Sequence, residues 1–129
     1  HEAEPDKVIR DWKSCTYSQS KLKHGWMPPH PTFYVRRSIY DMVGGFDVSF
    51  HIAADYDCML RILGHHKVCC KYIPQTFVKM RIGGVSNRSL SNILLKSKED
   101  YISLRKNGIG GLWALIWKNC RKLIQFFQR

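Results

Sequence analysis

The sequence has 129 residues, of which 44% are hydrophobic, so it can bury the core of one small domain and is not a disordered chain. Its net charge is +11, and the charge is unevenly distributed along the chain. Residues 1–57 contain 7 Lys and Arg and 8 Asp and Glu. Residues 58–129 contain 14 Lys and Arg, and their only acids are Glu99 and Asp100. Such asymmetry suits an anionic partner, but on charge alone we favour a solvated basic face. The chain opens without Met and without a signal-peptide pattern, so we expect a fragment or processed form of a longer protein.

The first part of the chain predicts short strands and short helices around a rigid loop. Residues 7–12 and 32–35 favour strands, because β-branched and aromatic side chains are common there. Residues 18–24 predict one or two helical turns, and residues 38–42 predict a short helix that ends before Gly44 and Gly45. Between them, residues 25–31 contain three prolines, which fix φ and remove hydrogen-bond donors. This segment is therefore expected to be an irregular loop that carries Trp26 and His30.

The second part predicts longer helices and two more strands. Residues 53–63 have the apolar spacing of a half-buried helix, and Gly64 ends it. Residues 68–73 and 76–82 are expected to be strands separated by Pro74. Residues 90–106 have helical periodicity with a stop at Asn107 and Gly108. The pattern is mixed α and β, with too few strands for a complete doubly wound sheet.

Residues 112–127 predict a last helix with an apolar and a basic side. The apolar face would carry Leu112, Ile116, Cys120, Leu123 and Phe127, with Trp113, Trp117 and Ile124 flanking them. The opposite face would carry Lys118, Arg121, Lys122, Gln125 and Arg129. No acid follows Asp100, so we expect the six cations from Arg105 onward to lack a neutralising partner. Two explanations stay open: the helix lies in the interface of an anionic membrane, or its apolar face docks on the protein core.

The cysteines do not indicate a disulfide scaffold. There are five of them, an odd number without regular spacing, which is typical of a reducing compartment. His65 and His66 followed by Cys69 and Cys70 suggest zinc ligands. Zinc sites, however, usually space paired ligands by two or more residues, and adjacent residues of a strand point to opposite faces. We therefore expect a turn and a strand here, and no zinc site.

Three clusters contain residues that could carry chemistry. They are Gly44-Gly45-Phe46-Asp47, the segment 53–61 and the segment 81–87. Each carboxylate also has a structural explanation. Asp47 can cap a turn, and Asp55 lies where the helix dipole favours a negative charge. Asp57 precedes Arg61 by four residues, which is the spacing of a helical ion pair. Taken singly, the structural explanation is the better one for all three.

Taken together and in order, these segments resemble part of the bacterial family 2 glycosyltransferases, which have the GT-A fold. GWMPPHPTFYVRRSIYDMVGGFD followed by IAADYDCMLRIL is similar to the region after the donor site, where a Gly-Gly-Phe-Asp loop precedes an acidic helix start. KMRIGGVSNR is similar to the strand and loop that close the site, and WKNCRKLIQFF to the end of polysaccharide-assembly members. Each motif is weak alone, and their order along the chain is the specific signal.

The resemblance implies an α/β fold, namely the C-terminal half of the Rossmann-like GT-A fold with amphipathic C-terminal helices. Residues 1–108 would form the acceptor-side half, and residues 109–129 a basic amphipathic helix. The nucleotide-binding half with its Asp-x-Asp metal motif would precede this region. A divalent metal, Mg²⁺ or Mn²⁺, would be bound mainly by that half, because Asp55 and Asp57 point about 200° apart on a helix. The chain alone would therefore be inactive.

The resemblance also implies inverting transfer from a nucleotide-sugar donor to a saccharide or lipid-linked acceptor in cell-surface polysaccharide synthesis. Family members usually have Glu-Asp at the helix start. Here Ala54 replaces the Glu, so Asp55 would be the catalytic base, and Arg61 makes Asp57 the weaker choice. Substrate contacts would come from both sides of this position: Trp26, His30, Asp47, Asp57, Arg81, Gly83, Gly84 and Ser86. Of these, Arg81 and the Gly83 and Gly84 amides would face the diphosphate.

Two other functions compete with transfer. A non-catalytic basic module for nucleic acid or an anionic membrane would interleave cations with exposed aromatic residues, which the sequence does not do before residue 105. No nucleic-acid partner is therefore expected. A glycosidase needs two carboxylates that face one bond, and Asp55 and Asp57 face apart on a helix. The expected location is the cytoplasm. The last helix would also allow a peripheral position at the inner face of the plasma membrane.

Overall fold

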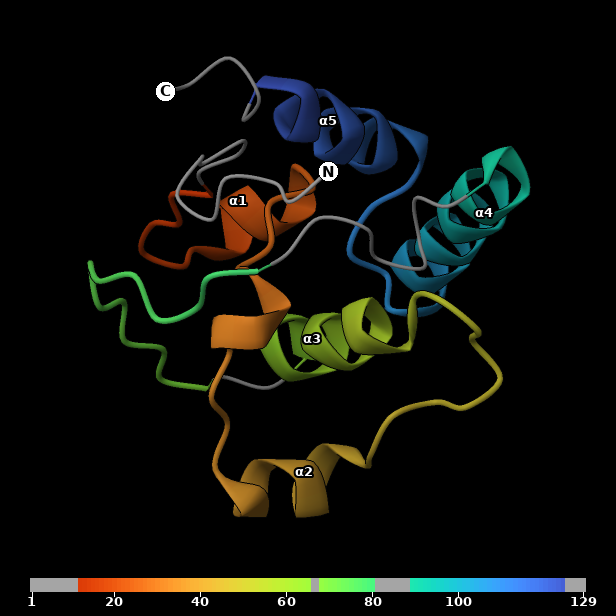
Figure 1. Ribbon diagram of the computed structural model, residues 1–129. Helices are drawn as coiled ribbons and strands as arrows, with labels where there is room; N and C mark the ends of the chain where they lie inside the picture. Colours follow the sequence, from red (N-terminus) through yellow and green to blue (C-terminus); the bar gives the residue numbers. More distant parts are fainter. Residues whose placement is uncertain (1–11, 66–67, 81–88, 125–129) are drawn as a thin grey trace.

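The computed structural model describes residues 12–65, 68–80 and 89–124, and every regular element within these ranges is helical (Figure 1). The elements are α1 (Gln19–Lys23), the short 3-10 helix η1 (His30–Thr32), α2 (Arg37–Val43), α3 (Ala54–His65), α4 (Leu90–Lys106) and α5 (Leu112–Ile124). The five helices expected from the sequence are confirmed, and the expected bounds of α4 agree at both ends. The proline loop is irregular apart from the single turn of η1.

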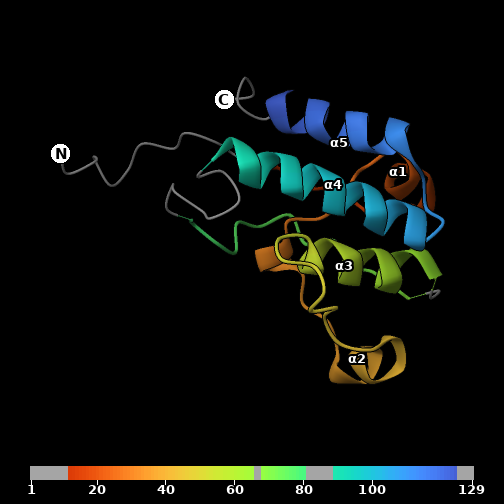
Figure 2. The same cartoon turned by 90° about the vertical axis from the view of Figure 1, so that its right-hand side faces the viewer.

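Three helices form a stack in which α4 lies between α3 and α5, as the side view shows (Figure 2). The helix α1 packs on α3, and α2 contacts α3 from the side away from α4. One hydrophobic core joins these elements: Leu22, Ala53, Tyr56, Leu60, Leu63, Leu104, Ile109 and Ala114. Residues from α1, α3, α4 and α5 thus share one core, and α2 contributes none of its members.

The helix ends follow from local sequence. The hydroxyls of Ser18 and Ser89 accept hydrogen bonds from the backbone N–H groups of Lys21 and Asn92, each at 3.2 Å, and so cap α1 and α4. At the other end of α4, Gly108 has a φ of +61°, a conformation that glycine adopts without steric cost. The chain can therefore turn back at once into α5.

Two glycines allow α5 to approach the other helices closely. Gly25 has a φ of +73°, and a Cβ atom there would lie 2.2 Å from the Ala114 carbonyl oxygen. A Cβ on Gly110 would lie 2.9 Å from the Ala114 Cβ. A larger residue at Gly25 would collide with α5 from the end of α1, and one at Gly110 would collide with the first turn of α5 and lie 3.4 Å from the Lys23 carbonyl oxygen of α1.

The expected α/β fold, a partial GT-A architecture, is wrong for the residues that the structure describes, because they contain no strand. Residues 32–35 begin in η1, and residues 68–80 run without helix or strand pairing and are mostly exposed. A strand exists only when its N–H and C=O groups pair with a neighbour, so β-rich composition without a paired partner does not form a sheet. Most of the expected strand 7–12 and the end of the strand 76–82 lie outside the described residues.

The orientation of α5 does not match one of the two explanations left open by the sequence, the docking of its expected apolar face, because Leu112 and Ile116 of that face are exposed. Ala114 is buried, Leu115 packs against the core, and the Lys118 side chain is only 11% exposed. The side chains of Trp113 and Trp117 point to solvent instead. None of the helices in the described ranges has both the length and the apolar content to cross a membrane.

Candidate functional site

The start of α3 is held by a side chain from α4. The Glu99 carboxylate accepts hydrogen bonds from the backbone N–H groups of His51, Ile52 and Ala53 at 2.9, 2.8 and 2.9 Å. Burial alone would raise the pKa of Glu99, but the three N–H groups more than offset this and lower it below its usual value. Glu99 thus acts as a distant cap for α3 and fixes the loop that leads to Asp55.

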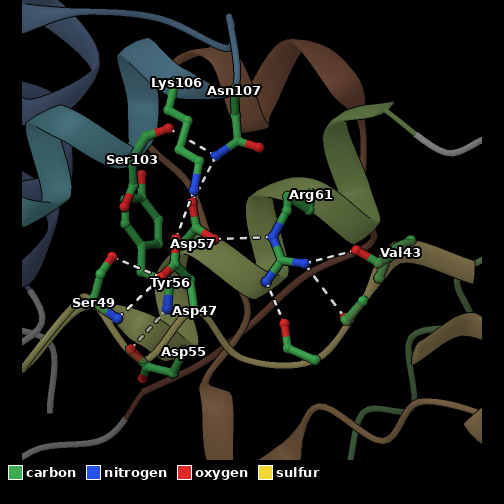
Figure 3. Close-up of polar contacts among 12 residues, drawn as sticks. Val43, Asp47, Ser49, Asp55, Tyr56, Asp57, Arg61, Ser103, Lys106 and Asn107 are labelled. Atoms are coloured by element: carbon green, nitrogen blue, oxygen red, sulfur yellow. Dashed lines mark hydrogen bonds and ion pairs between the residues drawn. The ribbon is translucent and has the colours of Figure 1, made fainter. Parts of the chain in front are cut away.

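Asp57 is a structural residue at the centre of a polar network (Figure 3). Its side chain is fully buried and accepts from Arg61 Nε at 2.9 Å and from Asn107 Nδ2 at 3.0 Å. The Arg61 guanidinium then donates to the carbonyl groups of Val43, Gly44 and Gly45. The expected helical ion pair of Asp57 is confirmed. Within this network no oxygen of the Asp57 side chain is exposed to solvent.

Asp47 is also fixed, although it lies nearer the surface. Its carboxylate accepts from Ser49 N and Ser49 Oγ at 3.0 and 2.6 Å, and it pairs with Lys106 Nζ at 2.6 Å. The hydrogen bond from Lys106, followed by those from Ser49, lowers the pKa of Asp47 far below its usual value. The turn-capping explanation from the sequence is confirmed, and Lys106 is a partner that the sequence did not predict.

Asp55 is the carboxylate of this region that faces solvent. It lies in the first turn of α3, its side chain is 38% exposed, and one oxygen accepts from Tyr56 N at 2.7 Å. The other oxygen lies 3.5 Å from His30 Nδ1. The structure therefore brings together two of the predicted site residues, Asp55 and His30, which come from α3 and from the turn η1.

Aromatic rings border this pair. The rings of His30 and Phe46 meet edge to face, with 6.2 Å between their centroids. The ring centroids of Phe46 and Tyr40 lie 6.1 Å apart. Phe46 is 49% exposed, so part of its ring is open to a ligand. Trp26, predicted to be a substrate contact, is only 8% exposed and packs on Tyr17.

A second charged cluster lies between α3, α4 and α5. The Lys118 ammonium pairs with Asp100 at 2.7 Å and lies 3.2 Å from the centroid of the Tyr56 ring. Lys96 pairs with the other oxygen of Asp100 at 3.1 Å. Burial lowers the pKa of Lys118 to about 8, against the opposing effect of Asp100. Burial, assisted by the charge of Asp100, raises the pKa of Tyr56 far above its usual value.

Several of the expected assignments change, and others concern residues outside the described ranges. Lys106 and Lys118, expected to be unneutralised, pair with Asp47 and Asp100. The predicted diphosphate contacts Arg81, Gly83 and Gly84 lie outside the described residues, and so does the predicted substrate contact Ser86. Sequence reasoning missed the roles of Glu99 and Asp100. A signal was present, because these are the only two acids in the basic second part of the chain.

The described residues do not fit a divalent metal. They contain no group of three His, Cys, Asp or Glu side chains arranged to hold one. Asp57 faces the interior and is occupied by Arg61 and Asn107, whereas Asp55 faces solvent, so the two do not share an ion. No chemical step at this site is therefore assigned to a metal.

Comparison with known proteins identifies no relative. A scan against protein-family models, a search of curated proteins and a search of solved structures each found no match. The likeness to family 2 glycosyltransferases thus remains a prediction that rests on the ordered motifs, and the residues of the site have to carry any functional proposal.

Proposed function

We propose that this chain supplies the acceptor side of an inverting glycosyl transfer, with Asp55 as the general base. The observation that carries the proposal is the contrast between Asp55 and its neighbours. Asp47 and Asp57 are held by cations, and Glu99 by three backbone N–H groups. Asp55 alone of these four combines an open surface with a histidine partner. A base must reach its proton, so exposure selects Asp55.

The surroundings of Asp55 suit a saccharide hydroxyl. The exposed part of the Phe46 ring gives an apolar surface on which the C–H face of a sugar can pack. His30 is close to both: its ring centroid lies 6.2 Å from that of Phe46, and its Nδ1 lies 3.5 Å from the Asp55 carboxylate. An acceptor packed on Phe46 could therefore present a hydroxyl group to Asp55, while His30 orients the carboxylate through its second oxygen.

The proposed step is a single displacement. The acceptor oxygen forms a bond to the anomeric carbon of a nucleotide-sugar as the bond from that carbon to the diphosphate oxygen breaks. The hydroxyl proton passes to Asp55, and the nucleoside diphosphate departs with the electron pair of the broken bond. The residues described here provide the base, its orienting histidine and an acceptor surface. Donor binding is assigned to residues outside them.

The test is a comparison of carboxylate-to-amide variants in the complete protein. Asp55→Asn should lower the rate of transfer by at least about 10²-fold, the scale of losing a general base. Asp41→Asn is the matched control, because Asp41 is exposed on α2 and should leave the rate unchanged. His30→Gln should cause a smaller loss, about tenfold, because the base remains but is less well oriented.

The measurement is nucleoside diphosphate release from a panel of UDP-, GDP- and dTDP-sugars with a lipid extract as acceptor. Circular dichroism of each variant should confirm that α3 is intact. If Asp55→Asn turns over as fast as Asp41→Asn, Asp55 is not the base and the proposal fails. The chain alone should bind none of these donors with sub-micromolar affinity, since its one Asp-x-Asp sequence, Asp55 to Asp57, lies on α3 with the two carboxylates facing apart.

A further inference from the structure

The helix α5 is docked by its small and polar side. Ala114 is buried against Gly25 and Gly110, and the ammonium group of Lys118 is buried between Asp100 and Tyr56. A lysine thus occupies the position on the helix that a leucine would take in an ordinary core contact. Because Lys118 and Ala114 face inward, the opposite side of α5 must face outward.

The outward side of α5 is strongly apolar. Trp113 is 76% exposed, Leu112 62%, Trp117 50% and Ile116 41%. At about 100° per residue these side chains occupy a continuous arc of about 140°, which is the width of a membrane-binding or core-facing stripe. We call these four residues the α5 apolar face. Helix α5 lies at the outside of the stack, with α4 on its inner side (Figure 2).

The charges next to this face are of one sign. Arg121 is exposed on the same helix, one turn after Trp117. The sequence from residue 101 to residue 129 contains no Asp or Glu. The charge of Lys118 is neutralised internally by Asp100, so it adds nothing to the surface. The α5 apolar face is thus bordered by the cation Arg121, with no acid on its own segment.

We propose that the α5 apolar face binds the surface of an anionic lipid bilayer, with α5 lying in the plane of the interface. Trp side chains are favoured at the boundary between headgroups and acyl chains, and Arg near an anionic surface gains electrostatic attraction. A second copy of the chain is a poorer occupant, because it would bring the same cation and no acid to the contact. This inference rests on α5 alone and is independent of the proposed glycosyl transfer.

The test uses surface substitutions, because deleting α5 would uncover Asp100 and Tyr56 and disturb the fold. The double variant Trp113→Ser/Trp117→Ser removes two exposed rings and leaves Ala114 and Lys118 in place. Val48→Ser/Met80→Ser is the matched control, because both residues are more exposed than Trp117 and lie outside α5. Sedimentation with vesicles of equal parts phosphatidylglycerol and phosphatidylcholine measures binding, and vesicles of phosphatidylcholine alone measure its dependence on charge.

The unmodified protein should bind the anionic vesicles, bind the neutral ones less, and dissociate as salt is added. The tryptophan double variant should lose at least about tenfold in affinity, whereas the control double variant should match the unmodified protein. Arg121→Gln should lose about fivefold, the effect of one basic residue near an anionic surface.

Three results would overturn the proposal. The first is that the unmodified protein ignores anionic vesicles. The second is that binding persists in the tryptophan double variant, which would place the contact elsewhere. The third is a dimer in solution that the tryptophan double variant disrupts without any effect of lipid, which would make a second copy the occupant of the α5 apolar face. Analytical ultracentrifugation of the same variants detects that dimer.

Discussion

Asp57 and Arg61 form an ion pair one turn apart on α3, and this pair connects the interior of the helix stack to the end of α2. The Asp57 side chain is fully buried, and Arg61 Nε lies 2.9 Å from it. The guanidinium group extends the connection to Val43 and the two glycines that follow it. A carboxylate that the sequence offered as a substrate contact therefore holds the loop 43–45 in place.

Removing this carboxylate should be costly. Asp57→Ala leaves the Arg61 charge largely buried without its partner, so we expect a loss of about 3 kcal/mol in the free energy of unfolding. Asp55→Ala, two residues earlier on the same helix and exposed to solvent, should lose less than about 1 kcal/mol. Urea denaturation measures both losses, and the slope of the free energy against urea concentration should be the same in the two variants. Equal losses in the two variants would contradict the structural role of Asp57.

Glu99 should make the protein sensitive to acid. Its pKa is lower in the folded chain than in the unfolded one, so its contribution to stability is present above about pH 4.3 and is lost as the pH falls through the folded value. Glu99→Gln should cost about 1 kcal/mol at neutral pH and should flatten the acid dependence. Asp41→Asn is the control and should track the unmodified protein. The prediction is wrong if Glu99→Gln and Asp41→Asn lose stability in parallel on acidification.

Lys118 should have the opposite dependence on pH. Its folded pKa of about 8 lies below the unfolded value, so the unfolded chain binds more protons above pH 8. Stability from this residue should therefore rise between about pH 8 and pH 10, by roughly 2 kcal/mol. Burial raises the thiol pKa values of Cys58 and Cys70, which act in the other direction.

The difference in the free energy of unfolding between the unmodified protein and Lys118→Met does not contain the cysteine contributions, which are common to both proteins. It should grow in favour of the unmodified protein across this interval, because methionine has no proton to lose. Lys23→Met, at an exposed position on α1, serves as the control. Thermal unfolding at a series of pH values measures all three proteins. A constant difference between Lys118→Met and the unmodified protein would show that the Lys118 pKa is not lowered.

Substitutions at two glycines with positive φ can separate the energetic cost of backbone strain from the cost of a collision between helices. Gly25→Ala would strain the backbone and also drive a Cβ into the Ala114 carbonyl, so it should cost about 3 kcal/mol. Gly108→Ala has the same type of backbone conformation with open space around it, and should cost about 1 kcal/mol. Urea denaturation compares the two. Similar costs would mean that α5 does not pack as closely on Gly25 as the structure has it.

Much of the local structure is determined by the sequence itself. The spacing of apolar residues predicted the three longer helices α3, α4 and α5, and Asn107 with Gly108 predicted the end of α4. The turn at Asp47 and the ion pair of Asp57 also followed from spacing. These features depend on contacts between residues a few positions apart, and such contacts are encoded in the order of the chain.

Only the tertiary structure decided the pairings between distant segments. Nothing in the periodicity of the chain indicates that Glu99 caps a helix that begins 45 residues earlier, or that Lys106 neutralises Asp47. Helical spacing divided α5 into an apolar and a basic side, but it could not say which side faces the core. The partner decides this: Asp100 is buried on α4 and requires a cation, so Lys118 turns inward and the tryptophans turn outward.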